Sequence, residues 1–153
     1  MKFSEDFLKF PMFVNQKKFC ELNFEILKEN YKKVIILKKG TRKALFMNKD
    51  GIVLFSSYQG KEINPFIWYV TIFGNEISFY SNHYYLSGIT ELNVVLAEEY
   101  NSKKWKFKII NNEYMFYLEN ENNVLTVDKN NVTLSKFNRN KLQLFSFKVI
   151  NYN

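Results

Sequence analysis

The stretch Trp105-Lys106-Phe107-Lys108-Ile109 places an apolar side chain at every second position, which is the pattern of a strand with one buried face. The same aromatic-x-aromatic-x-aliphatic pattern occurs at 66–70, beginning 39 residues earlier, and at 145–149, beginning 40 residues later. A period of about forty residues indicates one supersecondary unit that is repeated three times around a shared core.

Each of the three strands is preceded by a candidate hairpin. A leucine in an apolar run is followed by a turn of short polar residues, and then by a second apolar run. One further β-rich run stands ahead of each hairpin, so every unit has four predicted strands and the chain has twelve. The hairpin leucines are Leu45, Leu86 and Leu125, the second runs are 52–54, 94–96 and 132–134, and the leading runs are 34–37, 76–80 and 114–118.

Twelve short strands in three units that each end on aromatic side chains resemble the β-trefoil family, the fold of fascin-like, ricin-B-type and fibroblast-growth-factor-like domains. The resemblance covers roughly residues 31–150 and implies an all-β domain of three repeats, at about 31–70, 71–110 and 111–150. It also implies a six-stranded barrel capped by three hairpins. The core residues that it implies are Leu45, Leu86, Leu125, Phe66, Trp68, Trp105, Phe107, Phe145 and Phe147.

Residues 1–30 lie outside the repeat, and we interpret them as an N-terminal extension or arm. Ser4 can cap a short helical turn, which Pro11 would end. Polar and apolar residues alternate over 20–26 as in a half-buried strand, although a helical stripe through the same segment fits almost as well. In either form the arm is apolar enough to pack on the barrel or to enter a partner.

The expected compartment follows from the N-terminus and the cysteine count. Glu5 and Asp6 interrupt the N-terminus and no long apolar run follows, so no secretory signal is predicted. No run approaches the roughly 18 apolar residues of a membrane-spanning helix. A single cysteine cannot form an intrachain disulfide, which favours a reducing compartment. We therefore expect a cytoplasmic protein that does not bind membranes.

The chain has a formal net charge of +7, and its cations are unevenly placed. Residues 30–49 contain no Asp or Glu and carry seven Lys or Arg. Lys104, Lys106 and Lys108 alternate with aromatic residues, so they should line the outer face of one strand. Such surfaces attract phosphate or sulfate polymers. The predicted polyanion-binding residues are Lys32, Lys33, Lys38, Lys39, Arg42, Lys43, Lys104, Lys106, Lys108, Lys136, Arg139 and Lys141.

A compositional origin of the lysines is the main alternative. Two of the 22 cations are Arg and the chain has twenty Asn, a bias typical of an AT-rich genome. Lysine would then be a general solubilising residue, although random placement would scatter Glu through residues 30–49. An arginine-poor surface suits contacts with backbone phosphates better than base reading. Any nucleic-acid binding should therefore be directed by charge or shape rather than by sequence.

The sequence predicts no enzyme, no metal site and no cofactor. His83 is the single histidine, and its place in the turn before Tyr84 favours an ordinary turn position over a catalytic one. Cys20 lies outside the repeat, without a surrounding motif. One His, one Cys and three scattered Asp offer no ligand spacing for zinc or calcium, and the five Gly form no phosphate-binding loop.

A partial lectin motif is present in the third unit. Ricin-B-type units end in Gln-x-Trp, and Gln143-Leu144-Phe145 stands at the matching place. The corresponding segments of the first two units read Asn64-Pro65-Phe66 and Lys103-Lys104-Trp105, so the motif is complete in none of them. The match therefore supports the fold more than sugar binding.

Three functions remain open. We favour a non-catalytic intracellular binding module whose basic surface docks on RNA or a ribonucleoprotein such as the ribosome, in a regulatory or dormancy-type role. The second is a protein-binding trefoil, such as a fascin-like actin binder, which would depend on Tyr58, Tyr84 or Tyr100. The third is a lectin-like trefoil that binds a carbohydrate or a sulfated glycan. Binding to RNA or to a sulfated glycan should weaken steeply with salt, whereas binding to a neutral sugar should not.

Overall fold

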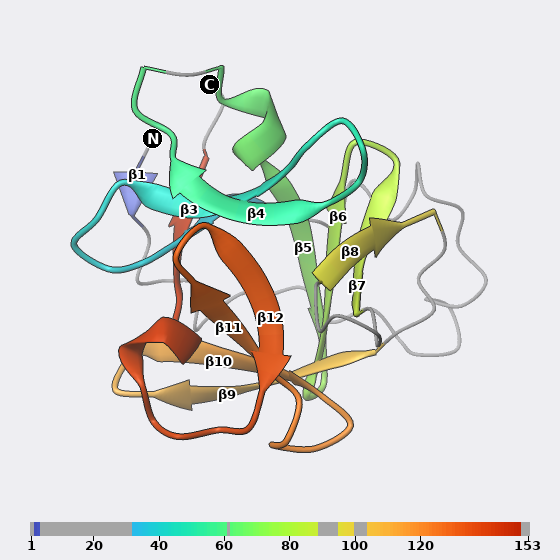
Figure 1. Ribbon diagram of the computed structural model, residues 1–153, viewed down its shortest axis with the longest axis vertical. Coiled ribbons are helices and arrows are strands. Elements are labelled where there is room, and N and C mark those ends of the chain that lie inside the picture. Colours follow the sequence, from blue (N-terminus) through green and yellow to red (C-terminus); the bar gives the residue numbers. More distant parts are fainter. Residues whose placement is uncertain (1, 4–31, 61, 89–94, 100–103, 151–153) are drawn as a thin grey trace.

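The computed structural model describes residues 2–3, 32–60, 62–88, 95–99 and 104–150, and its regular structure is almost entirely β-strand (Figure 1). All twelve strands predicted from the repeat are present. The first unit contains β2 (Lys32–Leu37), β3 (Lys43–Met47), β4 (Val53–Ser57) and β5 (Trp68–Phe73). The second contains β6 (Glu76–Ser81), β7 (Tyr84–Gly88), β8 (Val95–Glu98) and β9 (Trp105–Ile110). The third contains β10 (Glu113–Leu118), β11 (Val124–Asp128), β12 (Asn131–Ser135) and β13 (Ser146–Val149).

Two short 3-10 helices occupy the same place in different units. Helix η2 (Asn64–Phe66) leads into β5, and helix η3 (Lys141–Gln143) leads into β13. Each ends with a backbone N–H that donates to the first residue of the helix, from Ile67 to Asn64 and from Leu144 to Lys141.

Six strands pair around a closed ring. Strand β2 pairs with β5, β5 with β6, β6 with β9 and β9 with β10, all antiparallel. Strand β13 pairs with β2 on one side. On its other side, the backbone groups of Tyr114 and Phe145 exchange hydrogen bonds of 2.7 and 2.8 Å, which joins β10 to β13 and closes the ring. The result is the six-stranded barrel that the resemblance implies.

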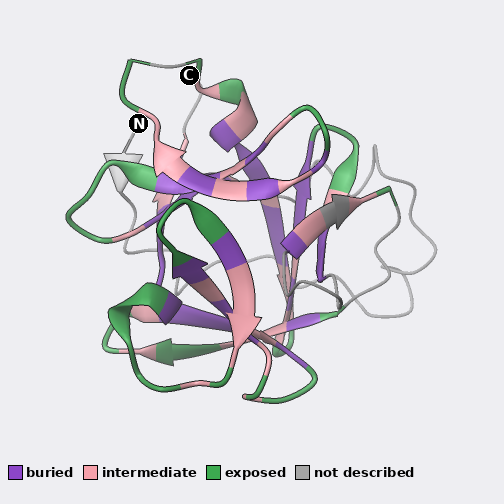
Figure 2. Cartoon of the chain, in the orientation of Figure 1, coloured by how far each residue is buried: buried purple, intermediate pink, exposed green. Residues whose placement is uncertain are grey.

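The remaining strands of the three units form the hairpins β3–β4, β7–β8 and β11–β12, which come together near the centre of the view in Figure 1. Backbone pairing of Asn131 with Leu54 and of Ile52 with Leu96 links the hairpins to one another. Buried positions, purple in Figure 2, run along all three units and form one main hydrophobic core. The predicted β-trefoil of three four-strand repeats is therefore confirmed.

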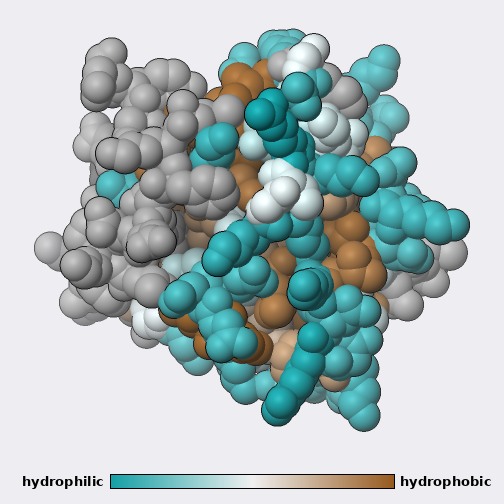
Figure 3. Space-filling view, turned by 90° about the vertical axis from the view of Figure 1, so that its left-hand side faces the viewer, coloured by the Kyte–Doolittle hydropathy of each residue, from teal (hydrophilic) through white to brown (hydrophobic). Residues whose placement is uncertain are grey.

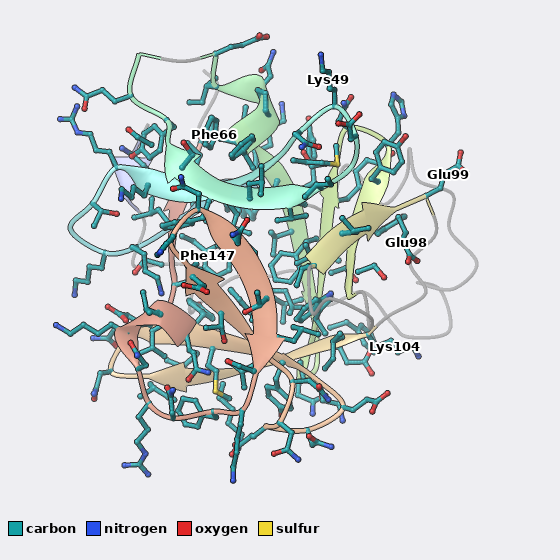
Figure 4. The ribbon with its side chains drawn as sticks, in the orientation of Figure 1. Lys49, Phe66, Glu98, Glu99, Lys104 and Phe147 are labelled. Carbon is teal, nitrogen blue, oxygen red and sulfur yellow. The ribbon has the colours of Figure 1, made fainter. Side chains whose placement is uncertain are left out.

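The repeat of the first unit is shifted by two residues from the predicted register. Trp68, rather than Phe66, is the counterpart of Trp105, so these two units are 37 residues apart instead of 39. Both Phe66 and Trp68 fit an aromatic-x-aromatic pattern, and the sequence does not distinguish them. Phe66 instead ends η2, where its label stands in Figure 4, and it is buried in a smaller cluster against Ile35 and Leu37, on the face of β2 opposite the main core.

Little of the predicted arm belongs to the described part of the chain. Its first residues form β1 (Lys2–Phe3), which pairs with β13 through Lys2 and Val149 and through Phe3 and Lys148. The predicted turn near Pro11 and the strand or helix over 20–26 lie outside the described residues and stay predictions. Among the described residues, no helix is long and apolar enough to cross a membrane.

Candidate functional site

A groove lies between the first and second units, where the β3–β4 turn, η2 and the β6–β7 turn approach one another. Its volume is about 710 Å³, which suits a small organic ligand. We call this cavity the groove. Its wall, floor and rim come from different elements, so no single stretch of sequence encodes it.

The wall of the groove is a row of side chains on three neighbouring strands. Lys33 on β2 stands opposite Tyr69 on β5, and Tyr69 stands opposite Tyr80 on β6. The Lys33 ammonium lies 5.5 Å from the centre of the Tyr69 ring, within the range of a cation–π contact. The Tyr80 ring meets Tyr85 of β7 edge to face at 4.8 Å, which fixes its orientation.

The floor of the groove is apolar and firmly held. Met47 and Ile67 line it and are buried, and Pro65 of η2 adjoins them. Ser81, at the end of β6, donates a buried hydrogen bond of 2.8 Å from its hydroxyl to the carbonyl of Ile67. This bond ties the second unit to the connection that precedes β5, so the floor is shared by two units.

The rim carries amides whose positions are partly set by hydrogen bonds. The Asn48 side-chain oxygen accepts from the backbone N–H groups of Asp50 and Ile52, at 2.9 Å each, so Asn48 can offer a ligand the donors of its amide nitrogen. Asn64 donates from its amide nitrogen to Glu62, 3.4 Å away, which leaves the Asn64 oxygen as an acceptor. Donors and acceptors are thus both present at the rim.

The β6–β7 turn forms the far side of the rim. Asn82 and His83 have φ angles of 47° and 73°, the left-handed backbone that a two-residue hairpin turn of type I′ requires. The histidine is a bulky residue for this conformation, which disfavours side chains with a Cβ. The structure therefore places His83 in a turn, as predicted, and also at the edge of a cavity, which was not predicted.

Two of the predicted basic clusters meet at a different place. Lys38 at the end of β2 donates to the carbonyls of Leu144, at 2.6 Å, and of Lys141. This contact brings the β2–β3 loop beside the loop between β12 and β13. The exposed cations of the two loops, of the start of β3 and of η3 form a surface that we call the basic edge, and they are Lys39, Arg42, Lys43, Lys136, Arg139 and Lys141. The basic edge lies on the left of Figure 1, the side that Figure 3 turns toward the viewer, where much of the described surface is hydrophilic.

Lys38 itself is partly buried and connects the β2–β3 loop to the segment before β13. Its ammonium lies 4.2 Å from the centre of the Phe145 ring, beside the two carbonyls that it contacts. Burial lowers the pKa of Lys38 to about 7, and the nearby Glu113 carboxylate opposes this shift in part. The Lys38 nitrogen is thus held by the protein's own backbone, although the sequence predicts it as a polyanion-binding residue.

The third predicted cluster does not join the basic edge. Lys106 and Lys108 point away from the core on β9, as predicted, and Lys104 is exposed just before the strand. In Figure 4, Lys104 lies on the side of the molecule opposite the basic edge. Lys108 forms an exposed ion pair with Glu121, which raises the pKa of Lys108. Lys106 pairs across the sheet with Glu76. The twelve predicted residues therefore do not make one continuous surface.

Lys32 and Lys33 also separate from the basic edge. Lys32 pairs with Val70 and Lys33 with Tyr69, both on β5, and Lys33 lines the groove. In the groove, the residues that the sequence did not single out are Tyr69, Tyr80 and the three asparagines. Their spacing along the chain carries no motif, because they belong to separate turns and strands that only the barrel brings together.

The partial lectin motif has a structural role. Gln143 is fully buried, and its amide nitrogen donates to Thr126, Ser135 and the Lys136 carbonyl at 3.2, 3.2 and 2.8 Å. Its oxygen accepts from the backbone N–H of Asn138 at 2.9 Å. Gln143 therefore fastens the loop before β13 to the β11–β12 hairpin.

A metal centre finds no support in the described part of the chain. No group of three or more His, Cys, Asp or Glu side chains lies close enough together there to hold a metal ion.

Comparison with known proteins identifies the fold. No protein-family model and no curated protein sequence matches the chain. It is similar to SeviL bound to an asialo-GM1 saccharide, with a TM-score of 0.62 and 11% identity over 76% of this chain and 96% of that chain. It is also similar to the Polyporus squamosus lectin bound to a Neu5Aca2-6Galb1-4GlcNAc epitope, with a TM-score of 0.64 and 12% identity over 76% of this chain and 48% of that chain.

An enzyme is among the similar structures. The chain resembles part of an endo-β-galactosidase from Clostridium perfringens, with a TM-score of 0.68 and 11% identity over 78% of this chain and 33% of that chain. The chain thus spans about half of the Polyporus lectin and a third of the galactosidase. At such low identity these likenesses establish the β-trefoil fold and leave the activity open.

Proposed function

We propose that this chain, which has the β-trefoil fold, is a non-catalytic carbohydrate-binding module whose ligand lies in the groove. The proposal changes the order of preference drawn from the sequence, which placed RNA first and a carbohydrate third. The reason is that the groove is a formed cavity, whereas the predicted polyanion-binding residues are divided among the basic edge, the β9 region and β2.

The observation that carries this proposal is the aromatic wall of Tyr69 and Tyr80 beside the amides of Asn48, Asn64 and Asn82. A sugar presents apolar C–H faces, which pack on aromatic rings, and hydroxyls, which both donate and accept hydrogen bonds. A wall held by strand pairing and a rim held by hydrogen bonds lose little conformational entropy when a ligand binds. The groove therefore combines the two kinds of contact that a sugar needs.

The similar structures support the same class of ligand. SeviL and the Polyporus lectin are both described with bound saccharides. The groove has one carboxylate, that of Glu62, on its lining in the described part of the chain. Glycoside hydrolysis ordinarily uses a pair of carboxyl groups, so the groove favours binding over cleavage.

Binding to a panel of immobilised glycans would test the proposal. We expect saturable binding by the protein, and a loss of about tenfold or more in affinity for Tyr69→Ala, because the sugar would lose its aromatic platform. Tyr117→Ala is the matched control. Tyr117 is half-buried on β10 and stands opposite Lys106 of β9, as Tyr80 stands opposite Tyr69.

The outcomes are distinct. Equal weakening by Tyr69→Ala and Tyr117→Ala would place any glycan elsewhere on the molecule. Absence of binding to every glycan at millimolar concentration would refute a carbohydrate function. Release of sugar from a bound glycan would contradict the non-catalytic part of the proposal.

A second candidate is binding to RNA or another polyanion at the basic edge. The observation that favours it is the Lys38 contact, which gathers cations from two loops that are about a hundred residues apart in the sequence. We expect Lys39→Glu with Arg42→Glu to abolish such binding, and Lys104→Glu with Lys106→Glu to preserve most of it. Affinity should also fall steeply with salt. Retention of nucleic acid by the first variant would rule out the basic edge. The actin-binding alternative, the ribosome as partner and the cytoplasmic location stay predictions.

A further inference from the structure

We infer that the groove selects a sugar that carries an acidic group, a carboxylate or a sulfate, and that Lys33 and Lys49 bind this group. The inference rests on the proposed function, since it names the class of carbohydrate that the same groove takes.

The units can be aligned through the aromatic residues at the start of their last strands. Trp68 pairs with Val34, Trp105 pairs with Ile77, and Phe145 pairs with Tyr114. These three pairs occupy equivalent places around the barrel, so the residues that precede Val34, Ile77 and Tyr114 are also equivalent. Those residues are Lys33, Glu76 and Glu113. A lysine in the groove thus replaces a glutamate that both other units carry.

The residues next to Lys33, Glu76 and Glu113 on the neighbouring strands also differ between the units. The groove has Tyr69 and Tyr80 next to Lys33. The equivalent row of the second unit has Lys106 and Tyr117 next to Glu76, so a cation and a carboxylate occupy opposite positions on neighbouring strands there. The row of the third unit continues with Ser146 and Leu37, which offer no aromatic ring. Of the three rows, the row Lys33, Tyr69 and Tyr80 in the groove is the one that joins a cation to two aromatic rings and contains no carboxylate.

The charges around the groove favour an anion. Lys33 lines the wall and Lys49 projects from the β3–β4 turn, where its label stands in Figure 4. Among the described residues, Glu62 supplies the one carboxylate of the lining, and it accepts a hydrogen bond from Asn64. Because the Lys33 ammonium lies 5.5 Å from the Tyr69 ring centre, a sugar packed near this ring would bring an acidic substituent within reach of the lysine. Lysine suits carboxylate and sulfate alike, since it acts as a compact charge.

Calorimetric titration with three related sugars tests the inference. The probes are lactose, lactose 3′-sulfate and sialyllactose, which share a neutral core and differ in the acidic group. We expect both acidic sugars to bind at least about tenfold more tightly than lactose, as one charge-assisted contact provides. Lys33→Glu, which introduces the residue of the other two units, should remove this preference while lactose still binds. Lys33→Gln provides the same test if the glutamate variant is poorly folded.

The control variant is Lys39→Glu, which makes the same change of charge on the basic edge. We expect it to leave the preference for acidic sugars intact. Equal affinity of the protein for lactose and for both acidic sugars would overturn the inference and leave the proposed function standing. Loss of the preference in Lys39→Glu, with no loss in Lys33→Gln, would overturn it by moving the acidic group to the basic edge. Failure of all three sugars to bind would overturn the inference together with the proposed function for this class of glycan.

Discussion

The two tryptophan side chains each make the same buried hydrogen bond. The Trp68 indole N–H donates to the Leu45 carbonyl at 3.1 Å, and the Trp105 indole N–H donates to the Leu86 carbonyl at 3.0 Å. Each bond joins the start of a barrel strand to the hairpin of its own unit. The third unit has Phe145 at this place, which fills the core without a donor. At this position the third unit therefore has only an apolar contact, whereas the first two units also have a hydrogen bond to the hairpin.

Trp68→Phe and Trp105→Phe should each lower the free energy of unfolding by about 1–3 kcal/mol, because a buried carbonyl loses its donor and a small void is left. Urea unfolding followed by circular dichroism measures the change. Tyr117→Phe is the control for removal of a polar atom from a half-buried aromatic residue. We expect it to lower the free energy of unfolding by less than either tryptophan variant. Trp variants as stable as the parent protein would mean that the two tethers contribute nothing.

Lys38 and Ser81 are equivalent residues with different chemistry. Ser81 follows Tyr80, which pairs with Tyr69, and Lys38 follows Leu37, which pairs with Ser146. Both side chains donate to the carbonyl of the residue before the core aromatic, Ile67 or Leu144. The serine does so without a charge, whereas the lysine brings an ammonium into a partly buried place.

Stability should depend on pH through Lys38. Its pKa is about 7 in the folded protein, against an ordinary value of 10.5. Between these values the unfolded chain binds the extra proton, so the Lys38 contribution to stability rises with pH across this window and is least favourable below pH 7. Each pKa unit corresponds to about 1.4 kcal/mol, and partial exposure of the ammonium will reduce the observed effect.

Lys38→Met, which keeps the apolar stem and removes the amine, is the matched variant for this effect. Urea unfolding of both proteins at pH 6 and pH 9 provides the test. We expect the parent protein to gain stability relative to Lys38→Met at the higher pH. A difference between the two proteins that does not change with pH would contradict the shift in pKa.

At the scale of elements, the β6–β7 turn combines strain with a place at the groove. His83 has a φ of 73°. His83→Gly should stabilise the protein by about 0.5–1 kcal/mol, because glycine adopts this backbone without a steric penalty. It should also weaken glycan binding, since the imidazole at the rim is lost. Thermal unfolding and the glycan panel report the two effects separately.

Asn112→Gly is the control for this turn. Asn111 and Asn112 form a similar two-residue turn between β9 and β10, with φ angles of 51° and 67°. Asparagine tolerates the left-handed region better than histidine, so we expect a smaller gain in stability and unchanged glycan binding. A loss of stability in His83→Gly would show that the imidazole makes contacts that outweigh the strain.

Gln143 controls the loop that carries half of the basic edge. Gln143→Met keeps the volume and removes all four hydrogen bonds, so we expect a loss of about 2–4 kcal/mol in the free energy of unfolding. Leu142→Ala, at an exposed neighbouring position, should cost much less. Equal losses in the two variants would show that the loop does not depend on the buried amide.

At the scale of the whole molecule, the sequence predicted the strands well because their spacing repeats. Periodic aromatic residues and turn residues define all twelve strands, and all three predicted hairpin leucines are buried. The two-residue error at Phe66 arose because a 3-10 helix and a strand meet inside one aromatic run. Local alternation cannot show where such a helix ends.

The candidate site was largely beyond prediction. The sequence predicts Lys33 as a polyanion-binding residue, yet its neighbours in the groove come from separate turns and strands. The charge pattern also did not show that Lys38 would turn inward and join two loops. The strands could be predicted from the sequence because they depend on residue type and spacing. The groove and the Lys38 contacts could not, because they form only when the barrel closes.

Binding of a carbohydrate in the groove between the first and second units can be tested at single residues. The most direct measurement is a backbone amide NMR titration of the protein with the best sugar from the glycan panel. We expect saturable shifts centred on Lys33, Asn48, Asn64, Tyr69 and Asn82. Shifts centred on Lys39, Arg42 and Lys141, or no saturable shifts at all, would contradict it.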